Sequence, residues 1–396
     1  MASANVLADS ALALWLAQSI AATITVAGYR LGLPQPEFPG AEPRVAVILP
    51  VRGSGGLATF LPALRSQVYD NYRIIATVES RDDPALAVLQ SARDAPGAPL
   101  EIVVAGLADR AGQKVWNQLA ALDRLAPADE IVAFIDADTL PTPLWLPRLV
   151  AVLVNSGRPV ATGYRWMTPA DSRASSISLA AANNAIAALP RGPLPMPLVW
   201  GGSVAMRRET LDAIRLRDFW RGAISDDVQM TVALREAGLT AHAPRQGLLL
   251  TPVACSWPDL LAFGVRQYRF VFLHEPWTWA VATAVLWAPP LFLTLAVPAF
   301  LSDSPAPWIV LAIGLGLAEA RTRIRRSIER TLWPALPETR SARRWRIESL
   351  LRPVWWMAHA ISAAGAPLSR RIDWAGIRYR VDGPQNVVIE ARKPAR

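Results

Sequence analysis

The chain has 396 residues, of which 52% are hydrophobic, with a mean hydropathy of +0.23 and a formal net charge of +9. The length is sufficient for a large hydrophobic core, and the positive mean hydropathy argues against a purely soluble protein. Its basic residues are arginines apart from Lys114 and Lys393, and they concentrate beside apolar runs. That placement favours an anionic membrane surface over nucleic acid as a partner. One cysteine, Cys255, excludes a disulfide framework and a cysteine-based metal site.

The N-terminal segment, residues 5–29, is apolar from about Ala11 to Tyr29. A signal peptide begins with basic residues, and none precedes this segment, so we expect a transmembrane helix. Arg30 and Arg44 follow it. The positive-inside rule then places the next domain in the cytoplasm of a protein integral to the cell (inner) membrane.

Residues 44–275 are expected to form one cytoplasmic domain. Short β-branched runs at 45–49, 74–78, 102–105 and 131–135 predict strands, and the patterns at 57–68, 84–93, 113–125 and 142–155 predict helices. This alternation predicts an α/β fold with right-handed βαβ units and a mostly parallel, Rossmann-like sheet. Ligands bind at the carboxyl ends of the strands in such sheets.

Polar residues follow three of the expected strands. Asp136 and Asp138 come directly after the fourth strand, and residues two apart in extended chain face the same side. Such a pair suits Mg²⁺ or Mn²⁺ held jointly with substrate phosphates, although an isolated D-x-D is also common in solvated loops. The residues after the first two strands are candidates for binding a nucleotide sugar: Arg52, Glu79, Asp82 and Asp83. Asp82-Asp83-Pro84 is equally typical of an ordinary helix start.

Two further segments are candidate substrate contacts. Lys114 is placed to reach a phosphate or the edge of the nucleotide, or merely to cap its helix. Gly201 and Gly202 leave the backbone free for close approach of the acceptor or its sugar, and a strained turn is the simpler alternative. From about 171 to 197 the chain predicts an amphipathic element near the bilayer that lines an acceptor path.

A general base is expected at Ser225-Asp226-Asp227, which precedes a helical pattern. We assign the base to Asp227, with Asp226 in support; an N-cap role is compatible with both. Arg266 and Arg269 share a helix face and suit the phosphates of a leaving diphosphate, or are simply juxtamembrane arginines. Phe270 is a candidate acceptor contact or a packing residue.

The C-terminal third predicts membrane attachment. Residues 277–320 predict a transmembrane hairpin, although its second half is short for a span. Residues 321–396 are expected to be basic and cytoplasmic, with an interfacial or re-entrant helix at 350–368. The segment 372–390 predicts a β-hairpin with Asp382-Gly383 at its turn.

Together these motifs resemble the membrane-bound, inverting GT-A glycosyltransferases of family 2 and their ceramide-glucosyltransferase-like relatives in family 21, over roughly residues 44–275. Phe270 departs from the (Q/R)-x-x-R-W motif of these families, because it stands where that motif has tryptophan. The stretches similar to the families' aspartate motifs are Asp82-Asp83, Asp136-Ala137-Asp138 and Asp227, and the stretch similar to their (Q/R)-x-x-R-W motif is Arg266-Gln267-Tyr268-Arg269-Phe270. Gln113 to Asn117 is similar to the N-x-K-x-x-N stretch of the relatives, and Ile372 to Gly376 resembles their C-terminal strand.

The resemblance implies a UDP-sugar donor, a Mg²⁺ or Mn²⁺ cofactor and a membrane lipid or glycan acceptor. We therefore expect inverting transfer of a hexose from a UDP-glucose-like donor to a hydroxyl of a ceramide- or hopanoid-like lipid. A processive polysaccharide synthase of family 2 and a catalytically inactive membrane scaffold are the alternatives. A Rossmann oxidoreductase is disfavoured, because Arg52-Gly53-Ser54-Gly55-Gly56 lacks the G-x-G-x-x-G spacing.

Overall fold

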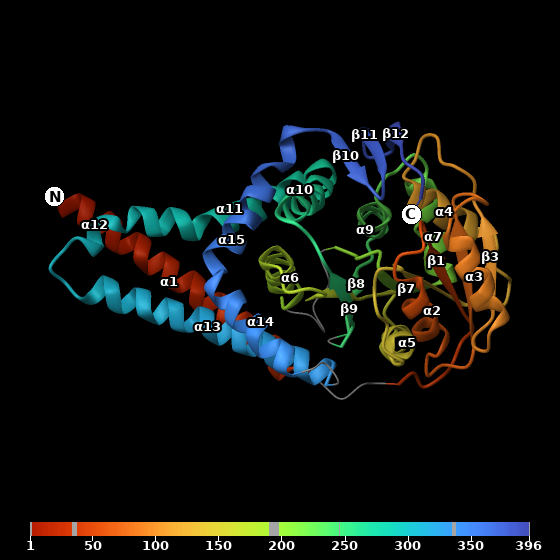
Figure 1. Ribbon diagram of the computed structural model, residues 1–396, viewed down its shortest axis with the longest axis horizontal. Helices are drawn as coiled ribbons and strands as arrows, with labels where there is room; N and C mark the ends of the chain where they lie inside the picture. The colour runs from red at the N-terminus through yellow and green to blue at the C-terminus, as the bar shows by residue number, and fades with distance from the viewer. Residues whose placement is uncertain (1, 34–37, 190–197, 245, 335–337, 396) are drawn as a thin grey trace.

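A computed structural model describes residues 2–33, 38–189, 198–244, 246–334 and 338–395. An α/β unit occupies one end of the molecule, and long helices project from it as a bundle (Figure 1). A smaller layer of helices and strands lies between the two, and the C-terminal strands lie against the α/β unit. The N-terminus is at the far tip of the bundle.

The α/β unit is built on a seven-stranded sheet of order β3-β2-β1-β4-β7-β5-β8. The first four strands are parallel, with Val47 of β1 facing Ile74 of β2 and Ala133 of β4. β7 runs antiparallel to both its neighbours, β4 and β5. The strand bounds are β1 (Val45–Pro50), β2 (Tyr72–Val78), β3 (Leu100–Val104), β4 (Ile131–Ile135), β5 (Val160–Thr162), β7 (Ser203–Arg207) and β8 (Ala241–His242).

Helices cover both faces of this sheet. One face packs against α2 (Leu57–Arg65), α3 (Ala85–Asp94) and α5 (Trp145–Asn155). The other packs against α4 (Gln113–Leu122), α7 (Arg208–Ala213), α8 (Leu216–Trp220) and α9 (Asp226–Glu236). A strand covered by helices on both faces needs apolar residues at every position. Ile131–Ile135 is such a strand, because all five of its residues are apolar and buried. The four expected strands and four expected helices are all confirmed, to within a few residues at their ends.

The middle layer pairs β6 (Tyr164–Pro169) with β9 (Leu248–Val253) and carries α6 (Ala174–Ala187) and α10 (Trp257–His274). The prediction of an amphipathic element at 171–197 is wrong for its helical part. Most of α6 is buried, its apolar and polar residues alike, because β6, α10 and two later helices cover it. The Asn184 side chain pairs with both backbone groups of Met167, which satisfies it in the interior. Residues 190–197 lie outside the described chain.

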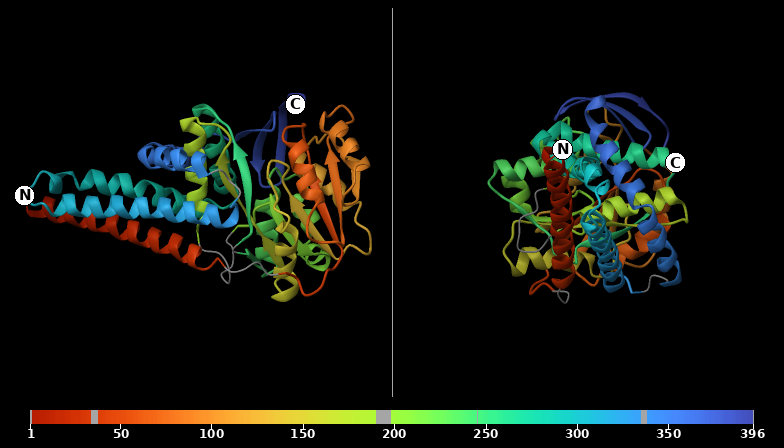
Figure 2. Two further views of the ribbon diagram at one scale, coloured as in Figure 1. Left: turned by 60° about the horizontal axis from the view of Figure 1, so that its bottom comes forward. Right: turned by 90° about the vertical axis from the view of Figure 1, so that its left-hand side faces the viewer.

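The projecting bundle consists of α1 (Ala2–Leu31), α11 (Pro276–Leu295) with the short α12 (Val297–Phe300), and α13 (Ala306–Leu332), which lie side by side (Figure 2). Two described helices are long and apolar enough to cross a membrane, over Val6–Leu31 and Pro276–Leu295. Only 6% of the second span is buried within the protein. α13 is the second arm of the expected hairpin, but it continues to Leu332 and carries arginines in its latter half.

The C-terminal segment forms α14 (Glu338–Leu350), α15 (Arg352–Ala364), the 3-10 turn η1 (Ala366–Leu368) and an antiparallel sheet of β10 (Arg371–Trp374), β11 (Ile377–Gly383) and β12 (Asn386–Arg392). The predicted two-stranded hairpin with its turn at Asp382-Gly383 is therefore wrong in two respects. The turn falls at 384–385, and an extra strand precedes it. The turn that connects β10 to β11 consists of Ala375 and Gly376. Both have positive φ, a conformation that glycine adopts without strain.

Candidate functional site

The carboxyl ends of β1, β2 and β4 meet at one rim of the sheet, because these strands are parallel neighbours. β7 runs the other way, so its beginning reaches the same rim, and Asp136 N donates to Gly202 O across that junction. Helices α4 and α9 also begin here. The structure thus brings most of the residues singled out from sequence to one edge, as expected for a sheet of this type.

Lys114 is the centre of charge at this rim. Its ammonium group lies 2.7 Å from Asp136 Oδ1 and 2.9 Å from Asp226 Oδ2. Burial by itself would lower the pKa of Lys114, but the adjoining Asp136 and Asp226 carboxylates outweigh burial and raise it. Lys114 is therefore a fixed cation that joins the D-x-D segment to the start of α9.

A close backbone contact brings α4 and α9 together. Gly112 N donates to Ala223 O, and a Cβ at Gly112 would lie 2.6 Å from Ile224 O. A larger residue at Gly112 would therefore push Lys114 away from Asp226. The sequence contains this signal, a glycine directly before a helix, but does not indicate that its partners are Ala223 and Ile224, far along the chain.

The two adjacent acidic residues at the start of α9 have different surroundings. Asp226 is buried, and its Oδ2 accepts from Gln118 Nε2 at 3.0 Å as well as from Lys114. Asp227 is half-buried, and its Oδ1 accepts from Ser225 Oγ at 2.5 Å and from Val228 N at 2.8 Å. Asp226 is thus neutralised, whereas Asp227 is held by one oxygen only.

The environment of Asp227 suits proton acceptance. Burial, and then the negative charge of Asp226, raise the pKa of the Asp227 carboxyl above its ordinary value. A carboxylate with a raised pKa is a stronger base than an ordinary one. Within the described residues no hydrogen bond engages Asp227 Oδ2, so this oxygen is available to a substrate.

Asp136 and Asp138 differ in the same way. Asp136 is paired with Lys114. Burial, together with the negative charges of Asp138 and Asp226, raises the pKa of Asp136 to about 6, against the opposing effect of Lys114. Asp138 is exposed, and no ion pair or hydrogen bond reaches its carboxylate from the part of the chain that is described. No group of three or more potential metal-ligating side chains occurs among those residues. One or two carboxylates at an open rim fit Mg²⁺ or Mn²⁺ that takes its other ligands from substrate phosphates and water.

The other strand-end residues form a cluster covered by the C-terminal sheet. Glu79 pairs with Arg52 at 2.9 Å and with Arg392 of β12 at 2.6 Å. Arg52 also donates to backbone carbonyls of Ala375 and Lys393. The candidate donor contacts Arg52 and Glu79 therefore hold the C-terminal sheet on the rim.

The two carboxylates in the loop after β2, those of Asp82 and Asp83, have different surroundings. Asp83 is buried, and its Oδ1 accepts from Gly53 N at 3.0 Å and from Ala85 N at 2.9 Å, so it ties the loop after β1 to α3. Its Oδ2 is buried and has no hydrogen-bond partner in the described structure. Asp82 is exposed at the same loop. The free Asp83 oxygen is the one placed to accept from a ligand bound at the rim.

Gly201 and Gly202 are explained by packing within the protein. A Cβ at Gly201 would lie 2.3 Å from Asp226 Oδ2, and one at Gly202 would lie 2.2 Å from the ring of Trp200. Both glycines are buried. Their small size lets the Asp226 carboxylate and the Trp200 ring take their positions.

Arg266, Arg269 and Phe270 project from α10 to three different surroundings. Arg269 donates to the backbone carbonyls of Ala366, Gly365 and Arg371, so it anchors the C-terminal sheet. Phe270 is buried and lies edge-on to Trp374 of β10 at 5.8 Å, in a core shared with that sheet. Arg266 Nε is buried without a hydrogen-bond partner in the described chain. Of the two arginines, Arg266 is therefore the one with donors to offer a ligand.

The sequence reasoning missed four residues at this site. Each reaches the rim only through tertiary structure: Gln118 of α4, Arg165 of β6, Trp374 of β10 and Arg392 of β12. Trp374 lies in the stretch Ile372 to Gly376 that resembles the relatives, but the sequence assigned it no role. Trp374 lies within 6.0 Å of the Arg266 guanidinium. An aromatic ring thus stands beside Arg266 even though Phe270 replaces tryptophan in the motif.

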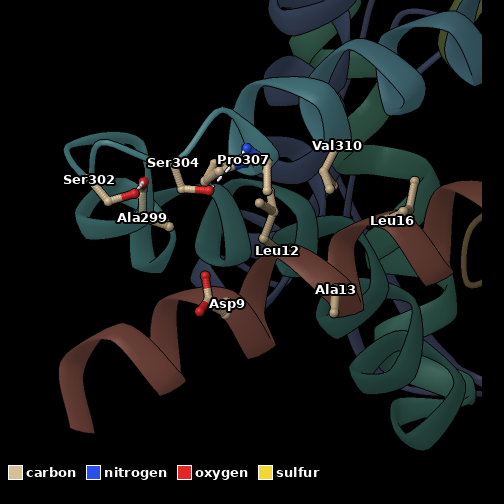
Figure 3. Close-up of a pocket in the computed structure, with 10 residues that line it drawn as sticks. Asp9, Leu12, Ala13, Leu16, Ala299, Ser302, Ser304, Pro307 and Val310 are labelled. Carbon is tan, nitrogen blue, oxygen red and sulfur yellow. Dashed lines mark hydrogen bonds between the residues drawn. The ribbon is translucent and has the colours of Figure 1, made fainter. Parts of the chain in front are cut away.

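A cavity of about 400 Å³ lies elsewhere, at the tip of the helical bundle (Figure 3). It opens between α1 and the α12–α13 loop, and its lining includes Asp9, Leu12, Ser302, Ser304 and Pro307. None of the residues that line it belongs to the rim. This cavity is therefore separate from the rim.

Comparison with known proteins agrees with this geometry. Residues 11–387 match the family model described as glycosyl transferase family 21. No curated protein gives a match. A mannosyltransferase from Pyrobaculum calidifontis, solved with GDP-Man and Mn²⁺, is 18% identical with a TM-score of 0.53, and the alignment covers 91% of this chain and 99% of that one. Residues 1–349 of S. aureus TarS, solved with UDP-GlcNAc, are 13% identical with a TM-score of 0.38, with 88% and 100% covered. The first of these likenesses confirms the GT-A fold.

Proposed function

This chain belongs to glycosyl transferase family 21 and is a glycosyltransferase, and from this premise we propose that it moves a hexose from a UDP-sugar to a hydroxyl group of a membrane lipid, with inversion. The observation that carries the proposal is the contrast between the two carboxylates at the start of α9. Asp226 is paired with Lys114, and Asp227 keeps one oxygen free. A single fixed, unpaired carboxylate is what a one-step inverting transfer requires of its base.

In this mechanism Asp227 Oδ2 accepts the proton of the acceptor hydroxyl as its oxygen attacks the anomeric carbon. Asp226 pairs with Lys114, and its negative charge, after burial, contributes to the raised pKa of Asp227. Ser225 and Val228 N hold the other oxygen of Asp227, so the free oxygen keeps one direction. The departing nucleoside diphosphate carries the developing negative charge away from this side of the site.

The donor is held at the opposite side of the rim. Asp138, with Asp136 beside it, is the residue that would hold Mg²⁺ or Mn²⁺ against the diphosphate, where the ion supplies charge neutralisation. Arg266 offers its buried Nε–H, which has no partner in the described chain, to the same phosphates. Asp83 Oδ2 is free to accept from the base or ribose of the nucleotide. The pyrimidine identity of that base rests on the family resemblance, since the neighbour from P. calidifontis was solved with GDP-Man.

A lipid acceptor is favoured by the surfaces next to the rim. α11 exposes large apolar side chains along a span of 20 residues, as a helix facing lipid does, among them Trp277, Val281, Val285 and Leu291. α10 connects this span directly to the rim, because it carries Arg266 and is separated from α11 by a single residue, Glu275. An acceptor anchored in the bilayer would therefore meet Asp227 where its hydroxyl emerges from the membrane.

A processive polysaccharide synthase is the second candidate, but fewer observations favour it. A growing polymer needs a path between several membrane helices. The described chain contains two helices of sufficient length and apolarity, α1 and α11, in a bundle that projects from the rest of the molecule (Figure 2). Single transfer to a lipid requires no such path.

The test is to incubate membranes containing the full chain with labelled UDP-glucose, UDP-galactose, UDP-N-acetylglucosamine and GDP-mannose, and to separate lipid from polymer. Label in an organic-extractable lipid from one UDP-sugar is expected. The matched control is the Asp227→Asn variant, which keeps the fold and loses the base. Label in an insoluble polymer would reverse the order of the two candidates, and label from GDP-mannose alone would overturn the UDP-sugar assignment.

A further inference from the structure

Two arginines lie together at the rim beside α10, and the described structure provides neither with a carboxylate partner at ion-pair distance. Arg165 comes from β6 and Arg266 from α10. Their guanidinium carbons lie 5.1 Å and 5.3 Å from the centroid of one ring, that of Phe263. Two cations that share a ring in this way repel each other unless an anion is bound between them.

Neither guanidinium is satisfied by its surroundings. The Nε atoms of Arg165 and Arg266 are both buried without a hydrogen-bond partner in the described chain. Arg165 makes one side-chain hydrogen bond, from its Nη2 to Gln267 Oε1 at 2.9 Å, which keeps it next to Arg266. An N–H group that is buried without a hydrogen-bond partner destabilises the folded protein. The two such groups here therefore indicate a ligand that accepts hydrogen bonds.

The electrostatics agree with this geometry. Burial, and then the positive charge of Arg165, lower the pKa of Arg266 to about 10, while Asp138 acts in the opposite sense. The Arg266 guanidinium is therefore close enough to interact with both the Arg165 cation and the carboxylate of Asp138, a candidate metal ligand. The Arg165 guanidinium also lies over the Trp200 ring, with its carbon 5.7 Å from the ring centroid, so aromatic contacts help to fix its position.

We propose that Arg165 and Arg266 form a two-guanidinium site that binds phosphate oxygens, with Arg165 as the second phosphate-binding arginine in the place that Arg269 takes in the sequence motif. Arg269 is committed to the carbonyls of Ala366, Gly365 and Arg371 and has no such role. The planar fork of each guanidinium matches a phosphate. This inference rests on the proposed function, because a glycosyl transfer from a nucleotide sugar supplies the diphosphate.

Phosphate oxygens reach this site from one of two sources, the diphosphate of the donor or the headgroup of a membrane phospholipid. The test uses the full chain in nanodiscs of phosphatidylcholine, which has no net charge. Inorganic diphosphate and UDP, each with Mn²⁺, are titrated by calorimetry into the wild type and into Arg165→Gln and Arg165→Lys. The matched control is Arg148→Gln, because Arg148 Nε is likewise buried and unpartnered in the described structure but lies on α5.

Arg165→Gln is expected to weaken binding of both probes roughly tenfold to a hundredfold, the effect of one charge-assisted hydrogen-bonded contact. Arg165→Lys keeps the positive charge but lacks the planar guanidinium, so its affinity for both probes should lie between that of Arg165→Gln and that of the wild type. Arg148→Gln should bind both probes like the wild type. The Lys variant keeps the test informative if Arg165→Gln does not fold.

A second measurement separates the two sources. Phosphatidylglycerol is added to the nanodiscs, and the lipid that stays bound to the solubilised protein is counted by native mass spectrometry. Loss of retained phosphatidylglycerol in Arg165→Gln, with diphosphate affinity unchanged, assigns the site to a lipid headgroup. Wild-type binding of both the diphosphates and phosphatidylglycerol in Arg165→Gln would overturn the site. Failure of the wild type to bind UDP would instead contradict the proposed function.

Discussion

Lys114 and Asp226 form a buried ion pair of 2.9 Å between the first turns of α4 and α9. Because α4 follows β3 and α9 follows β7 and α8, this pair fixes the donor side of the rim relative to the candidate base. The same ammonium group holds Asp136 at 2.7 Å. One cation thus sets the positions of two carboxylates.

Replacing Lys114 with methionine should destabilise the protein, because it leaves two carboxylates buried without their cation. Breaking a buried pair in this way costs about 3–5 kcal/mol. The double variant Lys114→Met/Asp226→Asn should regain part of that loss. Thermal unfolding in detergent measures both effects, with the exposed Lys393→Met as control. A double variant less stable than Lys114→Met would contradict the pairing.

Asp227→Asn should lower kcat by roughly a hundredfold to ten-thousandfold, the usual contribution of a general base. Nucleotide affinity should stay close to that of the wild type, because Asp227 faces the acceptor in the proposed mechanism. Rates with a saturating donor, and UDP titration by calorimetry, separate the two quantities. Asp212→Asn, on an exposed turn of α7, is the control. A variant with near-normal kcat would remove Asp227 from the mechanism.

The pH dependence of kcat should report the raised pKa of Asp227. A base works only when deprotonated, so a raised pKa means that activity is lost as pH falls, at a pH above the ordinary aspartate value of about 3.9. Asp226→Asn removes the neighbouring negative charge, and should therefore move this acidic limb to lower pH. Rates measured from about pH 4 to pH 8 test both statements. A limb that moves to higher pH in Asp226→Asn would refute the electrostatic account.

Arg269→Gln should weaken the attachment of the C-terminal sheet more than it weakens nucleotide binding, because Arg269 donates to three backbone carbonyls there. Limited proteolysis should cleave the segment after α15 faster than in the wild type. Arg266→Gln is the matched comparison, and should instead reduce UDP affinity with little change in proteolysis. An unchanged digestion pattern in Arg269→Gln, with lost UDP affinity, would return Arg269 to the donor site.

Removal of divalent cations should stop the transfer, since Asp136 and Asp138 are expected to hold the ion only together with the donor diphosphate. Activity should vanish in EDTA and return on addition of excess Mn²⁺ or Mg²⁺. Asp138→Asn should raise the Mn²⁺ concentration needed for half-maximal activity. Full activity in EDTA would show that the arginines and Lys114 neutralise the diphosphate alone.

The parallel part of the fold could be predicted from local sequence, because strands buried on both faces are written as continuous apolar runs. Ile131–Ile135 is the clearest case, since all five of its residues are apolar and buried. The C-terminal sheet was harder to predict. Its strands are half-exposed, so one turn was placed early and the turn at Ala375-Gly376 between β10 and β11 was missed.

The sequence by itself determined the rim and its chemical character, since polar residues directly after buried strands must lie at the carboxyl edge of a parallel sheet. It also indicated Asp227 and Asp138 as the residues to examine. Only the tertiary structure decided the partners: Lys114 neutralises Asp226, Arg269 holds the C-terminal sheet, and Arg165 stands beside Arg266. The reason is physical. Residue type and periodicity fix which edge a side chain reaches, whereas its charge state and availability depend on neighbours that are distant in sequence.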